Sequence, residues 1–264
     1  MGSEMCIRDR ESGGAPVVEG STAHGAFRGT WAPLPATERE SRLVFDLHGE
    51  ALGTSGRRLL LQGAEATEER LERELPRHAI LHLATHGFFN PEGVHSLWDA
   101  ALEGLVDARS RLGGEMRHLY GKHPGLLTGL VCAGASTGAP PGRDDGYLTA
   151  EELGWLDLSG VQLVVLSACE TALGRPQSGE GLLGLQRACL TAGADTVISS
   201  LWSVGDDSTW RLMRAFYTHL LERGLGRLEA LRGAQLSMLQ SNREQYGEGL
   251  PRTWGGFVLS GEWR

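Results

Sequence analysis

Two short apolar runs, each followed by a residue with reactive chemistry, dominate the pattern of hydrophobic and polar positions. The run VQLVVL spans residues 161–166, and the run AILHL spans residues 79–83. Short runs of this kind are typical of strands buried on both faces of a parallel sheet. Cys169 follows the first run and His86 follows the second. Because α/β folds bind ligands at the carboxyl edge of such a sheet, we expect both residues at that edge.

Helical and strand patterns alternate along most of the remaining chain. Spacing of apolar residues, early acids and terminal Gly or Pro predict helices over 36–48, 66–76, 149–153, 179–193, 206–224 and 226–240. Further strands are expected over 58–62, 126–134 (a strand or hairpin arm), 195–202 and 254–263. The segment 90–124 reads as a loop insertion with a helix near 97–112, and 134–146 reads as an exposed loop. The alternation predicts an α/β domain with a mostly parallel sheet.

Residues 1–33 lack this periodicity. They are rich in Gly, Ala, Ser, Thr and Pro and begin with MGSEMCIRDR. We therefore expect a disordered or non-native leader that lies outside the fold.

Composition narrows the classes of function. Hydrophobic residues make up 41% of the 264 positions, enough to fill the core of one large domain or two small ones. The net charge of −8 does not favour a broad nucleic-acid surface. Four widely spaced cysteines without a CxxC pair argue against a zinc cluster and a disulfide framework, and favour a reducing compartment. No apolar run reaches membrane-spanning length, so we expect a soluble cytoplasmic protein without membrane contacts.

Cys169 and His86 together could perform covalent acyl transfer if their strands are neighbours. A thiolate attacks a carbonyl carbon, and an imidazolium lowers the thiol pKa and protonates the leaving amine. Backbone N–H groups of Gly87 and Cys169 could form the oxyanion hole. The alternatives are a small buried Cys and a hydrogen-bonded structural His. His82 is four residues before His86, about 13 Å away along a strand, so we interpret it as structural and expect no metal site.

GEGLLG over 179–184 matches the GxGxxG pattern but does not follow a strand directly. A nucleotide-binding protein is therefore a distant third hypothesis.

Six stretches resemble CHAT domains, which are caspase-like cysteine peptidases of the separase, gingipain and caspase clan. The stretches are LHLATHGFF (81–89), DGYLTAEEL (145–153), LVVLSACETALG (163–174), GEGLLGLQRACLTAGA (179–194), SLWSVGDDST (200–209) and WGGFVLSGEW (254–263). The resemblance covers residues 34–264 and implies a caspase-like three-layer α/β/α sandwich, with a mainly parallel central sheet and an antiparallel edge strand. It matches His86 to the family's catalytic His and Cys169 to its nucleophile. The stretch before residue 34 is shorter than in the family, which is compatible with a domain truncated at its N-terminal edge.

Acidic residues predicted near this edge bear on substrate choice. Asp145, Glu170, Glu180 and Asp206 fall in loops or helix starts bordering it, and an acidic cleft would suit a basic side chain before the scissile bond. Helix capping is the competing interpretation for Asp206 and its neighbour Asp207.

The leading hypothesis is a cysteine endopeptidase that cleaves a protein partner through a Cys-His dyad and needs no cofactor. The resemblance implies tetratricopeptide repeats or another sensor region upstream in the full-length protein, and a role typical of bacterial conflict systems and regulated proteolysis. The alternative is a catalytically inactive CHAT scaffold or signalling module that binds partners through the same cleft.

Overall fold

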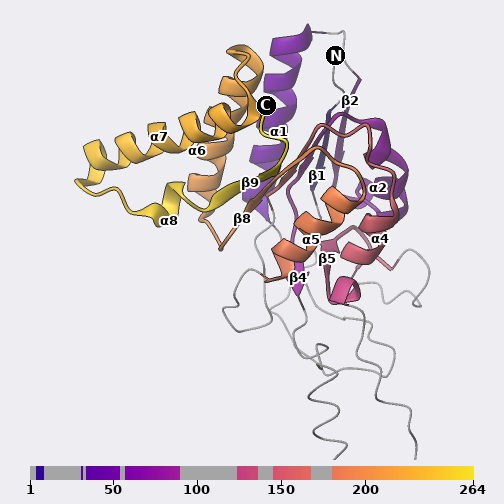
Figure 1. Cartoon of the computed structure of the whole chain (residues 1–264). Coiled ribbons are helices and arrows are strands. Elements are labelled where there is room, and N and C mark those ends of the chain that lie inside the picture. Colours follow the sequence, from indigo (N-terminus) through magenta and orange to yellow (C-terminus); the bar gives the residue numbers. More distant parts are fainter. Residues whose placement is uncertain are drawn as a thin grey trace, which may run out of the picture.

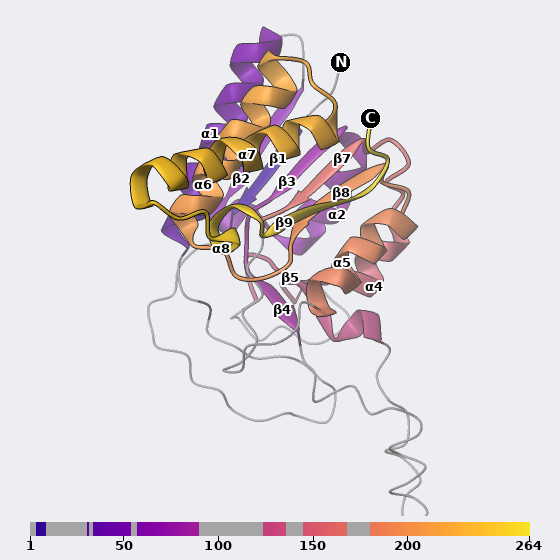
Figure 2. The same cartoon turned by 60° about the vertical axis from the view of Figure 1, so that its left-hand side comes forward.

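The computed structural model describes residues 4–8, 31, 34–53, 57–89, 124–135, 145–167 and 180–264. Its centre is a six-stranded sheet in the order β2-β1-β3-β7-β8-β9, with helices on both faces (Figure 1 and Figure 2). The strands are β1 (Glu4–Arg8), β2 (Arg58–Gln62), β3 (Ile80–Leu83), β7 (Leu163–Leu166), β8 (Thr196–Ser200) and β9 (Phe257–Gly261). All neighbours pair in parallel except β8 and β9. The predicted α/β/α sandwich with a mainly parallel sheet and an antiparallel edge strand is thus confirmed.

Each face of the sheet carries its own hydrophobic core, which explains why the central strand β7 is apolar at every position. Along β7, Leu163 and Val165 pack into one core, and Val164 and Leu166 pack into the other. The first core includes residues of α1 (Pro35–Leu52), α6 (Asp206–Tyr217) and α7 (Arg227–Tyr246). The second includes residues of α2 (Glu68–Glu74), α4 (Ala150–Trp155) and α5 (Glu180–Thr191). A strand that lies between two helical layers buries side chains on both of its faces, so it is mostly hydrophobic rather than alternating.

Strand β1 corrects the prediction for residues 1–33. Glu4–Arg8 was expected outside the fold, but it pairs in parallel with β2 on one side and with β3 on the other. The sequence of residues 1–33 does not predict this strand, because it lacks a periodic pattern. Five residues held between two neighbouring strands need no period of their own, because their place is specified by pairing with distant parts of the chain.

A second sheet of three short antiparallel strands lies beyond the end of β3 (Figure 2). It consists of β4 (Gly87–Phe89), β5 (Thr128–Val131) and β6 (Tyr147–Thr149). The strand or hairpin arm predicted over 126–134 is therefore β5. The predicted insertion helix at 97–112 and most of the predicted loop 134–146 lie outside the described residues.

Local signals at the helix starts are confirmed. Thr67 accepts a hydrogen bond from the Arg70 N–H at the start of α2. Thr149 and Glu152 form a reciprocal capping box at the start of α4, which satisfies two backbone donors that the helix leaves unpaired. In the described part of the chain, the other short elements are α8 (Pro251–Trp254), 3₁₀ turns at Gly63–Glu65, Leu75–Arg77 and Pro124–Leu126, and a π-helical turn at Thr218–Glu222.

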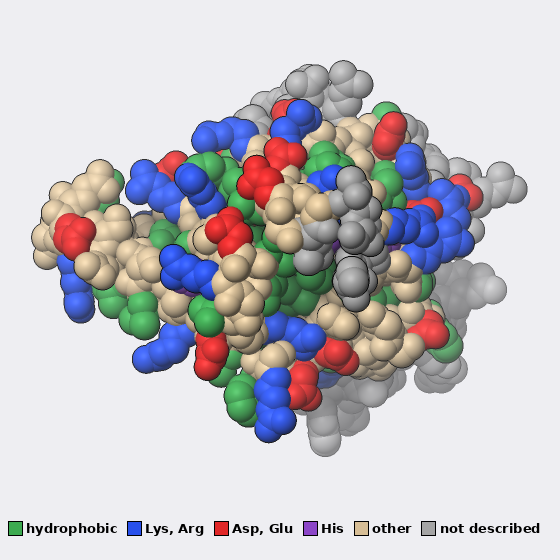
Figure 3. Space-filling view, turned by 90° about the horizontal axis from the view of Figure 1, so that it is seen from above, with side chains coloured by type: hydrophobic (Ala, Val, Ile, Leu, Met, Phe, Trp, Pro, Cys, Tyr) green, Lys and Arg blue, Asp and Glu red, His purple; other side chains and the backbone are tan. Residues whose placement is uncertain are grey.

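Acidic and basic side chains are interspersed on the face of the molecule seen in Figure 3. Within the described part of the chain, no helix is both long and apolar enough to cross a membrane.

Candidate active site

Strands β3 and β7 are direct neighbours, as the pairing of His86 with Cys169 requires. Their register places Leu83 opposite Leu166, and the ladder continues one residue further, because the Ser167 N–H donates to the Leu83 carbonyl at 2.9 Å. His86 is the third residue after Leu83, and Cys169 is the third after Leu166. Cys169 and Glu170 themselves lie outside the described residues.

The backbone around His86 is fixed by the second sheet. The Val131 N–H donates to the His86 carbonyl at 2.9 Å, and the Val131 carbonyl accepts a hydrogen bond from Thr85 Oγ1 at 2.7 Å. Gly87 then opens β4 and pairs with Leu130. The three residues between β3 and β4 therefore form a bridge between the two sheets. His86 lies on this bridge with only 5% of its surface exposed.

Trp31 also belongs to this site, although it falls in the segment that was predicted to lie outside the fold. Its indole ring lies 5.2 Å from the imidazole of His86, centroid to centroid, with the planes inclined by 38°. Trp31 is buried with Phe88, Val131 and Tyr147 in a small core of its own. The prediction that residues 1–33 lie outside the fold is wrong for this residue as well. The signal for it in the sequence is its large aromatic side chain in a segment that is otherwise mostly small and polar apart from Phe27, since a large apolar surface gains by burial.

Asp145 and Asp206 are held by different elements. Asp145 Oδ1 accepts a hydrogen bond from the Tyr147 N–H at 3.0 Å, just before β6. Asp206 is exposed and begins α6, after the parallel strand β8 has ended. The helix is preceded by Gly205 without a side-chain cap, so Asp206 does not cap it but faces its positive dipole end. Glu180 begins α5, and its side chain lies outside the described residues.

His82 is a buried structural residue, as predicted. Its Nε2 lies 3.0 Å from Glu40 Oε1 of α1, and its Nδ1 lies 3.1 Å from the Tyr217 hydroxyl of α6. It therefore faces the helical layer behind the sheet. Among the described residues, no group of three or more His, Cys, Asp or Glu side chains is arranged to hold a metal ion.

The CHAT domain family model matches residues 8–262. Tetratricopeptide repeat protein 28 from Mus musculus is 32% identical over 237 residues, and the same protein from Homo sapiens is 30% identical over 241 residues. Each match covers 89% of this chain, which spans about 9% of the length of these curated relatives.

Among solved structures, the Arg-specific cysteine proteinase gingipain R superposes with a TM-score of 0.51 at 11% identity. The match covers 98% of this chain and 46% of gingipain, and it shows a shared fold. With residues 8–262 matched by the family model, the chain belongs to the CHAT domain family and has the caspase-like fold seen in gingipain.

Proposed function

We propose that this chain is a cysteine endopeptidase in which Cys169 is the nucleophile and His86 the general base and acid. The observation that carries the proposal is the register of β3 and β7. Both candidate residues are three positions beyond a directly paired Leu83 and Leu166, and neighbouring strands run about 4.8 Å apart. Two residues that follow paired strand ends by the same number of positions are expected to lie close together. This expectation is our reason for pairing the Cys169 thiol with the His86 imidazole.

In the proposed reaction, His86 accepts the thiol proton, and the Cys169 sulfur forms a bond with the peptide carbonyl carbon. Backbone N–H groups of Gly87 and Cys169 would stabilise the resulting oxyanion. The C–N bond then breaks, and the leaving amine takes the proton from the imidazolium. Water, deprotonated by His86, hydrolyses the thioester and restores the thiol. A fixed backbone at His86 supports this role, because a general base must be oriented before the reaction starts.

We propose that the substrate is a protein with a basic side chain before the scissile bond. The support is the set of acidic residues that the sequence predicts near this edge, namely Asp145, Glu170, Glu180 and Asp206. Asp206 fits the role best among the described residues, because it is exposed and its carboxylate has no capping function. Asp145 already accepts a hydrogen bond from the Tyr147 N–H, so one of its carboxylate oxygens stabilises the turn before β6.

We further propose that residues 34–264 form the peptidase domain, to which β1 and Trp31 contribute from the preceding segment, and that a tetratricopeptide-repeat region lies upstream in the full-length protein. The names of the relatives support that architecture. Cys132 and Cys189 are free thiols, which is compatible with work in a reducing, cytoplasmic compartment.

Alkylation by iodoacetamide tests the dyad without a known substrate. The rate at Cys169 is measured by mass spectrometry of its peptide in the folded wild type and in His86→Ala. A thiolate paired with an imidazolium reacts faster near neutral pH than an unpaired thiol, so we expect about a tenfold or larger loss of rate in the variant. Cys189 is the internal control, because burial raises the pKa of its thiol to about 12 and it should react only when the chain unfolds.

An unchanged rate in His86→Ala would overturn the dyad and favour the inactive scaffold. Peptide cleavage that persists in Cys169→Ala would overturn the assignment of the nucleophile.

A further inference from the structure

We infer that Trp31 is a positioning residue for His86, holding the imidazole ring from the segment that precedes α1. The inference rests on the proposed role of His86 in the dyad. Its basis is that the aromatic ring packed against His86 comes neither from a strand of the two sheets nor from the loops that follow these strands. It comes from a residue four positions ahead of Pro35, the first residue of α1.

The contact acts on the side chain of His86 rather than on its backbone. Val131 already holds the backbone, both through the His86 carbonyl and through Thr85 Oγ1. These backbone contacts do not set the rotation about the side-chain bonds of His86. An indole ring 5.2 Å from the imidazole centroid, inclined by 38°, occupies one side of the ring and limits that rotation.

The chemical nature of the indole adds a second effect. The face of an aromatic ring attracts a cation, and Trp does so best. Contact with Trp31 therefore favours the imidazolium over the neutral imidazole, and the imidazolium is the form that stabilises a Cys169 thiolate. An aliphatic side chain of similar size would fill the same space without this attraction.

Trp31 is itself held in place by the second sheet. Its Nε1–H donates to the Tyr147 hydroxyl at 3.4 Å, and Tyr147 packs edge-on against Phe88 at 5.5 Å between centroids. The orientation of His86 thus depends on β6 and on the segment before α1 together.

The test compares Trp31→Phe with Trp31→Leu in the full chain. Phe keeps an aromatic face, whereas Leu keeps apolar volume alone. We expect the iodoacetamide rate at Cys169 to stay within about twofold of wild type in Trp31→Phe and to fall about five- to thirtyfold in Trp31→Leu. Thermal unfolding of both variants, with Cys132 and Cys189 protected from alkylation, checks that the fold is kept.

Equal rates in the Phe and Leu variants at equal thermal stability would overturn the inference and leave Trp31 a packing residue. If His86→Ala leaves the rate unchanged, the dyad itself fails, whatever the Trp31 variants do. A slow His86→Ala beside an unaffected Trp31→Leu would refute only the role of Trp31.

Discussion

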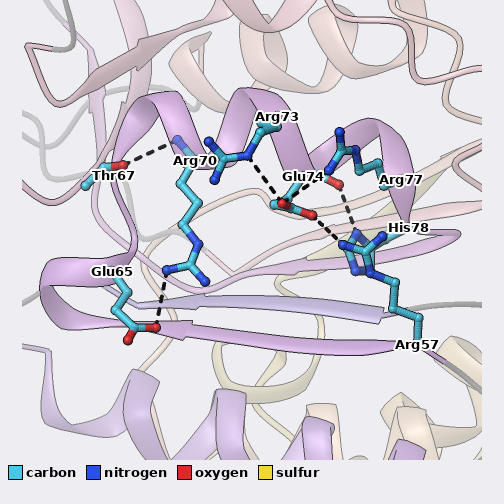
Figure 4. A network of polar contacts seen from close by, with 8 residues as sticks. All are labelled: Arg57, Glu65, Thr67, Arg70, Arg73, Glu74, Arg77 and His78. Atoms are coloured by element: carbon cyan, nitrogen blue, oxygen red, sulfur yellow. Dashed lines mark hydrogen bonds and ion pairs between the residues drawn. The ribbon is translucent and has the colours of Figure 1, made fainter.

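Glu74 shows how one buried carboxylate can organise a set of basic side chains at the end of α2 (Figure 4). Its Oε2 lies 2.9 Å from Arg57 Nη2, and its Oε1 lies 3.4 Å from Arg73 Nε and 3.5 Å from Arg77 Nη1. Glu74→Gln keeps the shape but removes the charge that offsets repulsion among the guanidinium groups. We expect a loss of about 1–3 kcal/mol in the free energy of unfolding, measured by urea denaturation.

Glu65→Gln is the matched control for Glu74→Gln. Glu65 pairs with Arg70 at 3.5 Å, but its side chain is 64% exposed. Water and salt screen such a pair, so the cost should stay below about 0.5 kcal/mol. Equal losses in the two variants would show that burial of Glu74 does not set the strength of its ion pairs.

At this scale the sequence identifies His86 through its place after a buried run, but it does not reveal Trp31 or Val131. The first inference needs only local pattern, since a strand and the residue after it are adjacent in the chain. The contact between Trp31 and His86 joins positions 55 residues apart, and nothing in either local pattern encodes it. Specific aromatic contacts of this kind depend on where distant strands place the two rings.

Among the elements, the second sheet has no room for added volume at Gly129. A Cβ at Gly129 of β5 would lie 2.5 Å from the Leu148 carbonyl oxygen and 2.6 Å from Phe88 Cε1. Gly129→Ala must therefore separate β5 from its neighbours, at a cost of about 1–3 kcal/mol. Because Val131 of β5 holds the His86 carbonyl, we expect faster hydrogen exchange in β4 and β5 together with slower alkylation of Cys169.

Gly154→Ala in α4 is the control for Gly129→Ala. No atom lies within 4 Å of a Cβ built at Gly154, and Ala favours a helix over Gly by up to about 1 kcal/mol. The variant should be neutral or more stable, with exchange in β4 and β5 unchanged. If Gly129→Ala behaved in the same way, the second sheet would not be the support of His86.

The elements that the sequence predicts are those with strong local patterns, and those it misses depend on pairing. Apolar runs predict β3 and β7, and helical spacing with acidic first turns predicts α5 and α6. Strand β1 escapes prediction, because its five residues take their place only between β2 and β3. Strand β4 also escapes prediction, because it has only three residues. It can be distinguished from the loop after His86 only once its partner strand β5 is known.

For the molecule as a whole, buried histidines on the two faces of the sheet predict sensitivity to acid. Burial lowers the pKa of His48 in α1, and the nearby Arg58 lowers it further. Burial also lowers the pKa of His78, next to β3, and Arg57 and Arg77 add to this, while contacts with Glu74 partly oppose it. In both cases the folded chain resists protonation that the unfolded chain accepts near the ordinary value of 6.5.

The sign of the effect follows from proton binding. Below about pH 6.5 the unfolded state binds more protons than the folded state, so the free energy of unfolding falls with the pH until the lowered pKa values are reached. Asp157 does not contribute in this window, because its pKa is lowered from 3.8 by hydrogen bonds from Ser159, and it titrates at more acidic pH.

Urea denaturation between about pH 8 and pH 5 measures this loss in the wild type, in His78→Asn, in His48→Asn and in the double variant. Asn at position 78 can still donate a hydrogen bond to the Glu74 carbonyl, as His78 Nδ1 does at 2.9 Å. Unlike the His side chain, the Asn side chain does not become protonated in this pH range. Each single variant should lose less stability than the wild type between neutral and mildly acidic pH, and the double variant should lose least. The two losses should add, because His48 in α1 and His78 beside α2 are buried in separate helical layers on opposite faces of the sheet. A pH dependence that is the same in all four proteins would place the acid sensitivity elsewhere in the chain.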